Sequence, residues 1–136
     1  MGLIIDTCVF IRAEKQNNVF DFGQWRSDEE IYISAITVSE LLIGVYRADT
    51  KARQLKRSAF VEAIIANIAI IDFTAEVARI HAEIYAHLAS QGKVIGAHDL
   101  IIAATAVAHG YELLTLNQHE FSRVPGLTIR SGTPAI

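Results

Sequence analysis

The sequence predicts an α/β protein with a largely parallel sheet. Short apolar runs alternate along the chain with longer segments of helical periodicity, which is the order of elements found in α/β sandwiches. The chain has 136 residues, of which 51% are hydrophobic, and this is a common size for one domain with a substantial core. We therefore expect a single domain over residues 1–136.

Five short apolar runs have the character of strands. They cover residues 3–5, 31–33, 68–71, 113–116 and, as a short edge strand, 127–129. Uninterrupted apolar runs of this length are typical of strands that are buried.

The helical segments lie between these runs. Residues 75–90 have apolar side chains three and four positions apart, with Thr74 as a plausible N-cap and Gly92 as a stop. Residues 99–109 are apolar nearly all round, which predicts a central, buried helix. Helical patterns also cover residues 36–47 and 51–67, and a further helix is expected to start near residue 7.

Composition excludes several classes of protein. No apolar run approaches the ~18 to 20 residues of a membrane-spanning helix, and the N-terminus lacks the features of a signal peptide, so we expect a soluble cytoplasmic protein. The one cysteine, Cys8, cannot form an internal disulfide, and we expect a small core side chain there. The absence of a P-loop or G-x-G-x-x-G motif disfavours ATP and dinucleotide chemistry.

Basic residues are concentrated in one place, although the formal net charge is −3. The basic cluster comprises Arg47, Lys51, Arg53, Lys56 and Arg57. Such a cluster is either a patch that contacts phosphates or a solvated, salt-bridging surface, and the sequence leaves both interpretations open.

Three acidic residues stand in or against apolar segments: Asp6, Glu40 and Asp99. An ionised carboxylate is costly there unless it is paired, hydrogen-bonded or bound to a metal, and three such residues indicate one shared cation. Asp6 follows the first predicted strand, at the end where open parallel sheets place their ligands. Capping of a helix N-terminus is the alternative for both Asp6 and Asp99.

Glu40 points away from the main apolar stripe of its predicted helix, which by itself is typical of a solvated residue. The neighbouring Ile36, Ile43 and Gly44 make that face too apolar and too small for ordinary solvent surface. We therefore expect the wall of a cleft, in which Gly44 leaves space.

Further polar residues lie close to these acids. Asn117 or Glu120 follows the strand predicted at residues 113–116 and offers another oxygen, although a turn residue and an exposed acid would look the same. Oxygen ligands without cysteine suit Mg²⁺ or Mn²⁺. His98, beside Asp99, either contacts the substrate or is a hydrogen-bonded bystander, and no flanking signature supports a Cys8-based nucleophilic site.

Four segments together closely resemble the PIN-domain toxin ribonucleases of bacterial toxin–antitoxin pairs, the VapC type. The segments are LIIDT at 3–7, ISAITVSELLIG at 33–44, GAHDLIIAA at 96–104, and LTLNQHEF at 114–121 followed by VPGL at 124–127. They occur in the family's order and at its spacing over almost the whole chain.

The resemblance implies a three-layer α/β/α sandwich and a metal-dependent endoribonuclease. The resemblance implies that Asp6, Glu40 and Asp99 surround Mg²⁺ or Mn²⁺. The fourth position of the family's site would be Asn117, with Glu120 as a nearby alternative. Asp6 and Asp99 are then our first choice as direct ligands, and Glu40 acts through water or orients the nucleophile. The expected reaction is in-line attack of a metal-activated water on an RNA phosphodiester.

The resemblance also implies partners. It predicts an RNA substrate, a homodimer and a cognate antitoxin that covers the active site with a peptide segment. The basic cluster would grip RNA. A few apolar side chains would contact the antitoxin; the alternative is that they pack in the core. A few hydroxyl groups would donate hydrogen bonds to the carboxylates; the alternative is that they cap helices. The apolar candidates are Phe20, Phe22, Trp25 and Tyr46; the hydroxyl candidates are Thr7, Thr37, Ser39 and Thr115.

Two alternatives share the same fold and acids. One is a nuclease that processes nucleic acid outside any toxin–antitoxin pair. The other is a nucleic-acid- or protein-binding module with little catalysis, against which the intact Asp6, Glu40 and Asp99 argue.

Overall fold

The computed structural model describes residues 2–16 and 29–130. Its centre is a five-stranded sheet in the order β3-β2-β1-β4-β5, in which every neighbouring pair is parallel. The strands are β1 (Gly2–Ile5), β2 (Glu30–Ser34), β3 (Ala69–Ile71), β4 (Glu112–Leu114) and β5 (Thr128–Arg130). The chain adds β2 and β3 on one side of β1 and then crosses to add β4 on the other, so the topological switch point lies between β1 and β4.

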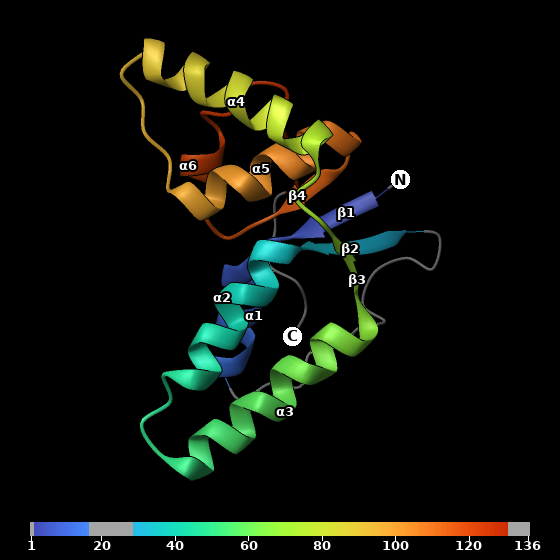
Figure 1. Cartoon of the computed structure of the whole chain (residues 1–136), viewed down its shortest axis with the longest axis vertical. Helices are drawn as coiled ribbons and strands as arrows, with labels where there is room; N and C mark the ends of the chain where they lie inside the picture. Colours follow the sequence, from blue (N-terminus) through green and yellow to red (C-terminus); the bar gives the residue numbers. More distant parts are fainter. Residues whose placement is uncertain (1, 17–28, 131–136) are drawn as a thin grey trace.

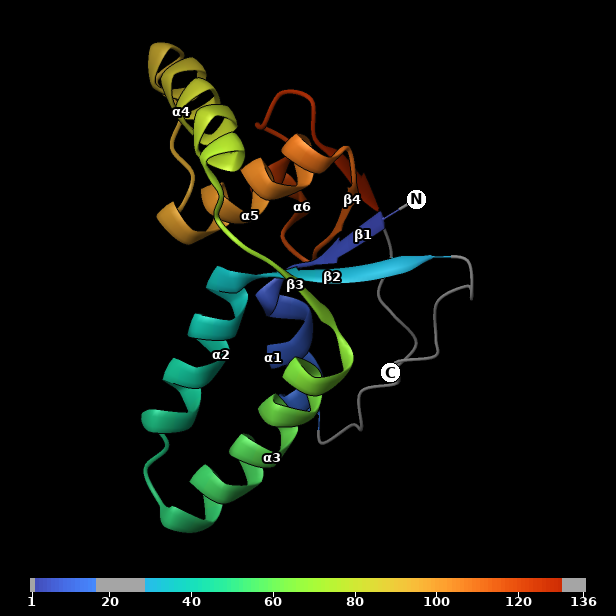
Figure 2. The same cartoon turned by 45° about the vertical axis from the view of Figure 1, so that its right-hand side comes forward.

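Helices cover both faces of the sheet. They are α1 (Thr7–Lys15), α2 (Ala35–Tyr46), α3 (Lys51–Asn67), α4 (Ala75–Ser90), α5 (Ala97–His109) and α6 (Gln118–Phe121). In both views α1, α2 and α3 lie on one side of the sheet, and α4, α5 and α6 lie on the other (Figures 1 and 2). The expected three-layer α/β/α sandwich is confirmed.

The central strand β1 shows why the sequence needs two helical layers. Leu3 and Ile5 are fully buried in the core formed with α1, α2 and α3, whereas Ile4, between them, is fully buried in the core formed with α4 and α5. Because alternate residues of a strand face opposite sides, an uninterrupted apolar run requires cover on both faces. Asp6 follows this run at the carboxyl edge of the sheet.

Most predicted boundaries are close to the observed ones. The helices predicted over residues 51–67 and 75–90 are confirmed, and α5 begins two residues earlier than predicted, at Ala97. The strand predicted over 113–116 was too long, because β4 ends at Leu114. The side chain of the next residue, Thr115, donates a hydrogen bond to Asp6 in the site described below. Among the described residues, no helix combines the length and the apolar character that spanning a membrane requires.

Candidate active site

Asp6 occupies the N-cap position of α1, but its side chain makes no capping hydrogen bond. The carboxylate is buried, and its Oδ2 accepts hydrogen bonds from Thr115 Oγ1 at 2.8 Å and from Cys8 Sγ at 3.0 Å. Burial is the largest influence on this carboxyl and raises its pKa; hydrogen bonds oppose that effect, and the charge of Glu40 adds to it. Asp6 therefore holds the N-cap position, as one interpretation predicted, but its carboxylate binds Thr115 and Cys8 instead of capping α1.

Thr115 joins the two strands at the switch point. Its fully buried hydroxyl donates to Asp6 at the end of β1 and accepts from the backbone N–H of Asn117 at 2.9 Å. One side chain thus holds the carboxylate and shapes the turn that follows β4.

Glu40 is held at both carboxylate oxygens. Thr7 Oγ1 donates to Oε1 at 2.6 Å, and His98 Nδ1 lies 3.2 Å from Oε2. The Thr7 hydroxyl is also 2.9 Å from Thr37 Oγ1. Glu40 is therefore a fixed member of the site rather than a solvated residue, whereas Ser39, also predicted to hold a carboxylate, is exposed and makes none of these contacts.

Gly44, predicted to leave space in the wall of a cleft, lies against a side chain of α3. Arg57 occupies the space beside it: the Gly44 carbonyl accepts from Arg57 Nη1 at 2.8 Å, and a Cβ on Gly44 would lie 3.7 Å from Arg57 Cδ. A side-chain carbon at that distance would make an ordinary contact, so the arginine does not require glycine at this position.

Asp99 is the third residue of α5 and lies in its first turn, where the helix dipole favours a negative side chain as predicted, although the N-cap position itself belongs to Gly96. Its pKa is raised to about 6, first by burial and then by the charges of Asp6, Glu120 and Glu40. His98 opposes this shift. The pKa of Asp99 is therefore raised by negative charges on residues that are far apart in the sequence.

Asn117 and Glu120 were predicted as alternatives, but they contact each other. Asn117 Nδ2 donates to Glu120 Oε2 at 2.6 Å, and the Gly96 N–H donates to Glu120 Oε1 at 2.9 Å. The bond from Gly96 is the main reason why the Glu120 pKa is lowered. A Cβ on Gly96 would lie 3.4 Å from Asp99 Oδ2, so this bridge runs directly beside Asp99.

Cys8 is a member of the site that the sequence did not reveal. Its thiol donates to Asp6 Oδ2, and its pKa is raised to about 12, mainly by burial and also by the Asp6 charge. The thiol therefore stays protonated at neutral pH, which argues against nucleophilic catalysis. The only sequence signal was its position two residues after Asp6, on the first turn of α1.

The donor set fits a hard divalent cation, because it consists of carboxylate oxygens whose mutual repulsion a cation would relieve. Within residues 2–16 and 29–130, however, no three His, Cys, Asp or Glu side chains are grouped closely enough to enclose a metal. Mg²⁺ typically keeps several waters and takes only one or two carboxylates, so such an enclosure is not required.

The basic cluster is divided in its contacts. Both carboxylate oxygens of Asp49 accept from Arg53 at 2.8 Å, and Arg57 pairs with Glu14 at 3.1 Å. Arg47 and Lys51 are exposed and have no carboxylate partner in the part of the chain that the structure describes. The salt-bridging interpretation therefore holds for part of the cluster, and a smaller basic surface remains.

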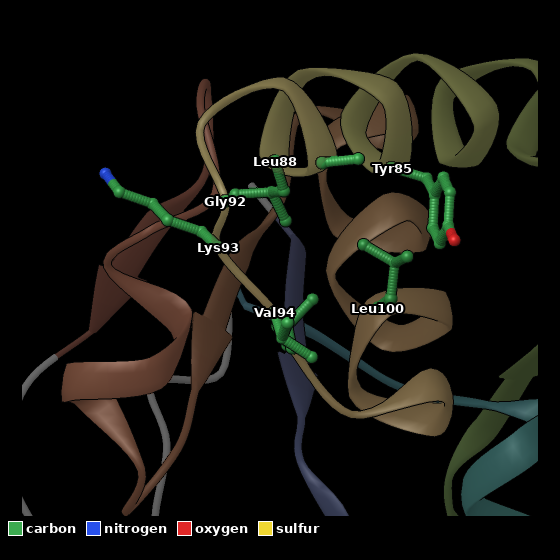
Figure 3. A pocket seen from close by; sticks show the side chains of 8 residues that line it. Tyr85, Leu88, Gly92, Lys93, Val94 and Leu100 are labelled. Atoms are coloured by element: carbon green, nitrogen blue, oxygen red, sulfur yellow. The ribbon is translucent and has the colours of Figure 1, made fainter.

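Of the apolar residues predicted to meet a partner, Phe20, Phe22 and Trp25 lie outside the described residues. Tyr46, at the end of α2, is 77% exposed. A separate pocket of about 240 Å³ lies between α4, the loop after it and α5, where Leu88, Val94 and Leu100 contribute apolar side chains (Figure 3). No carboxylate lines this pocket, so it is distinct from the acid cluster.

Comparison with known proteins agrees with this architecture. A family model described as PIN domain matches residues 3–127. Ribonuclease VapC1 of Rickettsia felis is 42% identical over 129 residues, which cover 95% of each chain. The tRNA(fMet)-specific endonuclease VapC of Salmonella typhimurium is 31% identical over 124 residues, which cover 91% of each.

A solved structure shows the same fold. The structure of VapBC2 from Rickettsia felis, bound to a DNA fragment from their promoter, superimposes with a TM-score of 0.85 at 27% identity, and the match covers 96% of this chain and 98% of that chain. The family model spans nearly the whole chain, and the relatives match it over nearly their full length. The chain belongs to the PIN domain family.

Proposed function

We propose that this protein is a metal-dependent endoribonuclease and the toxin of a VapBC-type toxin–antitoxin pair. The observation that carries the proposal is the convergence of Asp6, Glu40 and Asp99 at the carboxyl edge of the sheet, where Asp99 has a pKa of about 6. The similarity to VapC ribonucleases gives this acid cluster its substrate class, RNA.

Asp6 and Asp99 are our candidates for direct binding of Mg²⁺ or Mn²⁺, with Glu40 acting through water. When bound, such a cation supplies Lewis-acid polarisation of a phosphodiester and a more acidic water. Hydrogen bonds to Asp6 Oδ2 and to both oxygens of Glu40 fix these carboxylates before substrate arrives. A preorganised acceptor of this kind can orient a water and take its proton without first rearranging.

The remaining polar groups would position the substrate. Asn117 adds an exposed amide at the rim, which is held by Glu120. Arg47 and Lys51 offer positive charge to the RNA backbone, which offsets the repulsion between phosphates and the acid cluster.

Cleavage of RNA by the purified chain tests this proposal. Total bacterial RNA and initiator tRNA are incubated with Mg²⁺, with Mn²⁺ or with EDTA, using the wild type, Asp99→Ala and Asp72→Ala. Asp72 is an exposed aspartate between β3 and α4 and serves as the matched control. We expect metal-dependent fragments from the wild type and from Asp72→Ala, but none from Asp99→Ala or with EDTA.

Two outcomes would contradict the proposal. Fragments that persist with Asp99→Ala or with EDTA would place the activity elsewhere, and a complete lack of cleavage of both RNAs would favour a binding module. Initiator tRNA is included because relatives at 31% and 33% identity are named tRNA(fMet)-specific endonucleases.

The proposal includes a cognate antitoxin and a homodimer in the cytoplasm. Exposed apolar side chains on α2 and α3, namely Ile43, Tyr46 and Leu55, provide a surface for a protein partner. Co-expression with the small gene next to this one is expected to yield a complex that no longer cleaves RNA. Growth arrest that persists despite the neighbouring gene would argue for a nuclease outside a toxin–antitoxin pair.

A further inference from the structure

We propose that His98 is a positioning residue, which fixes Glu40 for the reaction through a hydrogen bond from Nδ1 to Oε2. This inference rests on the proposed ribonuclease function. It assigns a task to a residue that the sequence left open between a contact to substrate and a bystander.

The contact joins two parts of the fold. His98 is the second residue of α5, Glu40 lies in the middle of α2, and 58 positions separate them in the sequence. Helices α2 and α5 lie on opposite sides of the sheet (Figures 1 and 2). The 3.2 Å contact from Nδ1 to Oε2 therefore bridges the two helical layers at the carboxyl edge.

The two oxygens of Glu40 are held from different sides of the site. Thr7, at the start of α1, donates to Oε1, and His98 reaches Oε2. A glutamate has three rotatable side-chain bonds, and one hydrogen bond would leave the carboxylate free to pivot about the held oxygen. The second contact removes that freedom, so His98 determines the orientation of the carboxylate.

The chemistry of the contact determines which nitrogen carries a proton. An ionised carboxylate only accepts hydrogen bonds, so the hydrogen must reside on Nδ1. Both the neutral Nδ1–H tautomer and the imidazolium satisfy this condition. The positioning role therefore requires a donor at Nδ1 and does not require a positive charge.

His98 has little to do with the stability of the core. Its side chain is 48% exposed, and an ion pair or hydrogen bond at such a position contributes little to folding. Its neighbour is Asp99, so the same contact also sets the first turn of α5 relative to Glu40. Substitution is expected to alter the site and leave the fold intact.

Three substitutions separate the two ring nitrogens. His98→Ala removes both, His98→Asn places an amide nitrogen as many bonds from Cα as Nδ1, and His98→Gln does the same for Nε2. His87→Ala, at an exposed histidine of α4, is the matched control. The rates are measured on an RNA oligonucleotide that spans a cleavage site mapped with the wild type in total bacterial RNA.

We expect His98→Ala to lower kcat by on the order of 10- to 100-fold, as for other residues that orient the ligands of a metal site, with little change in KM. His98→Asn should recover most of the loss, whereas His98→Gln should not. Equal losses in all three variants, recovery by Gln alone, or a change confined to KM would overturn the positioning role and favour a contact to RNA.

Crystal structures of the wild type, His98→Ala and His98→Asn supply a measurement that is independent of cleavage. The Glu40 carboxylate is expected to leave its position in the alanine variant and to remain in the asparagine variant. A Glu40 that stays in place in His98→Ala would overturn the inference even if RNA is cleaved. Lack of cleavage by the wild type would count against the proposed function, and the structures would still decide the role of His98.

Discussion

Replacing Asp99 with asparagine is expected to abolish cleavage and yet make the metal-free protein more stable at neutral pH. The folded protein raises the Asp99 pKa from 3.8 to about 6, because ionisation is opposed by burial and by the charges of Asp6, Glu120 and Glu40. At 1.36 kcal/mol for each unit of pKa, the ionised carboxylate costs up to about 3 kcal/mol. Asparagine has a similar shape and carries no charge, so it relieves this cost.

The effect has a defined pH dependence. A raised carboxyl pKa means that the folded state binds the proton more tightly than the unfolded state does, so the Asp99 contribution to stability falls as pH rises. The penalty is absent below about pH 3.8, grows between pH 3.8 and about 6, and is complete above that. The stability gained by Asp99→Asn should follow the same course.

The assay is urea or thermal unfolding in EDTA at pH 8 and at pH 4, with Asp72→Asn as an exposed control. Asp99 is only partly buried and solvent screens its charge, so the gain should be at most about 3 kcal/mol, which corresponds to at most roughly 10 °C in Tm for a chain of this size. The gain should be large at pH 8 and small at pH 4, and the control should be unchanged at both. An Asp99→Asn protein that is less stable than the wild type at pH 8 would refute the electrostatic reasoning.

Three further predictions follow from the same contacts. Mg²⁺ at one hundred times its Kd should stabilise the wild type by about 2.7 kcal/mol in thermal unfolding at pH 8, but not Asp99→Asn; equal stabilisation of both would place the cation elsewhere. Thr115→Val, which removes the donor to Asp6, should cost about 1 to 3 kcal/mol in urea unfolding and weaken Mn²⁺ binding in calorimetry; unchanged binding would show that Asp6 needs no such support. Gly2→Ala would place a Cβ 2.6 Å from the Tyr111 ring and should lower the free energy of unfolding by about 1 to 3 kcal/mol in urea. RNA cleavage should persist, because Gly2 begins β1 at the end of the strand opposite the site. Loss of cleavage would contradict that separation.

Local signals in the sequence predict elements well where one physical cause dominates. The helix α4 has its apolar stripe, a Thr74 side chain that caps it and a stop at its end, and its bounds were predicted correctly. The strand β4 ends earlier than its local pattern predicts. Leu113, Leu114 and Leu116 continue one apolar pattern, but the Thr115 hydroxyl is taken by Asp6 and by the backbone of Asn117, and this ends the strand.

The site was predicted as a set of residues, and its hydrogen bonds were not predicted. Local sequence left the carboxylate of Asp6 without an identified partner, because Thr115, which donates to it, is 109 positions away. Glu120 and the Gly96 N–H are 24 positions apart, and only the tertiary fold brings them together. The Cys8 thiol escaped prediction because an isolated cysteine in an apolar segment is usually a core side chain.

The donors around the acid cluster explain how the site can be ordered and still carry negative charge. Asp6 is held by a hydroxyl and a thiol, and Glu120 by an amide and a backbone N–H. Neutral donors fix the direction of a carboxylate without cancelling its charge, unlike the arginine that pairs with Glu14 on α1. Of the donors that contact Asp6, Glu40 or Glu120 within the described residues, only His98 can become positively charged. The protein thus supplies the geometry of the site and leaves most of its negative charge for a cation to neutralise.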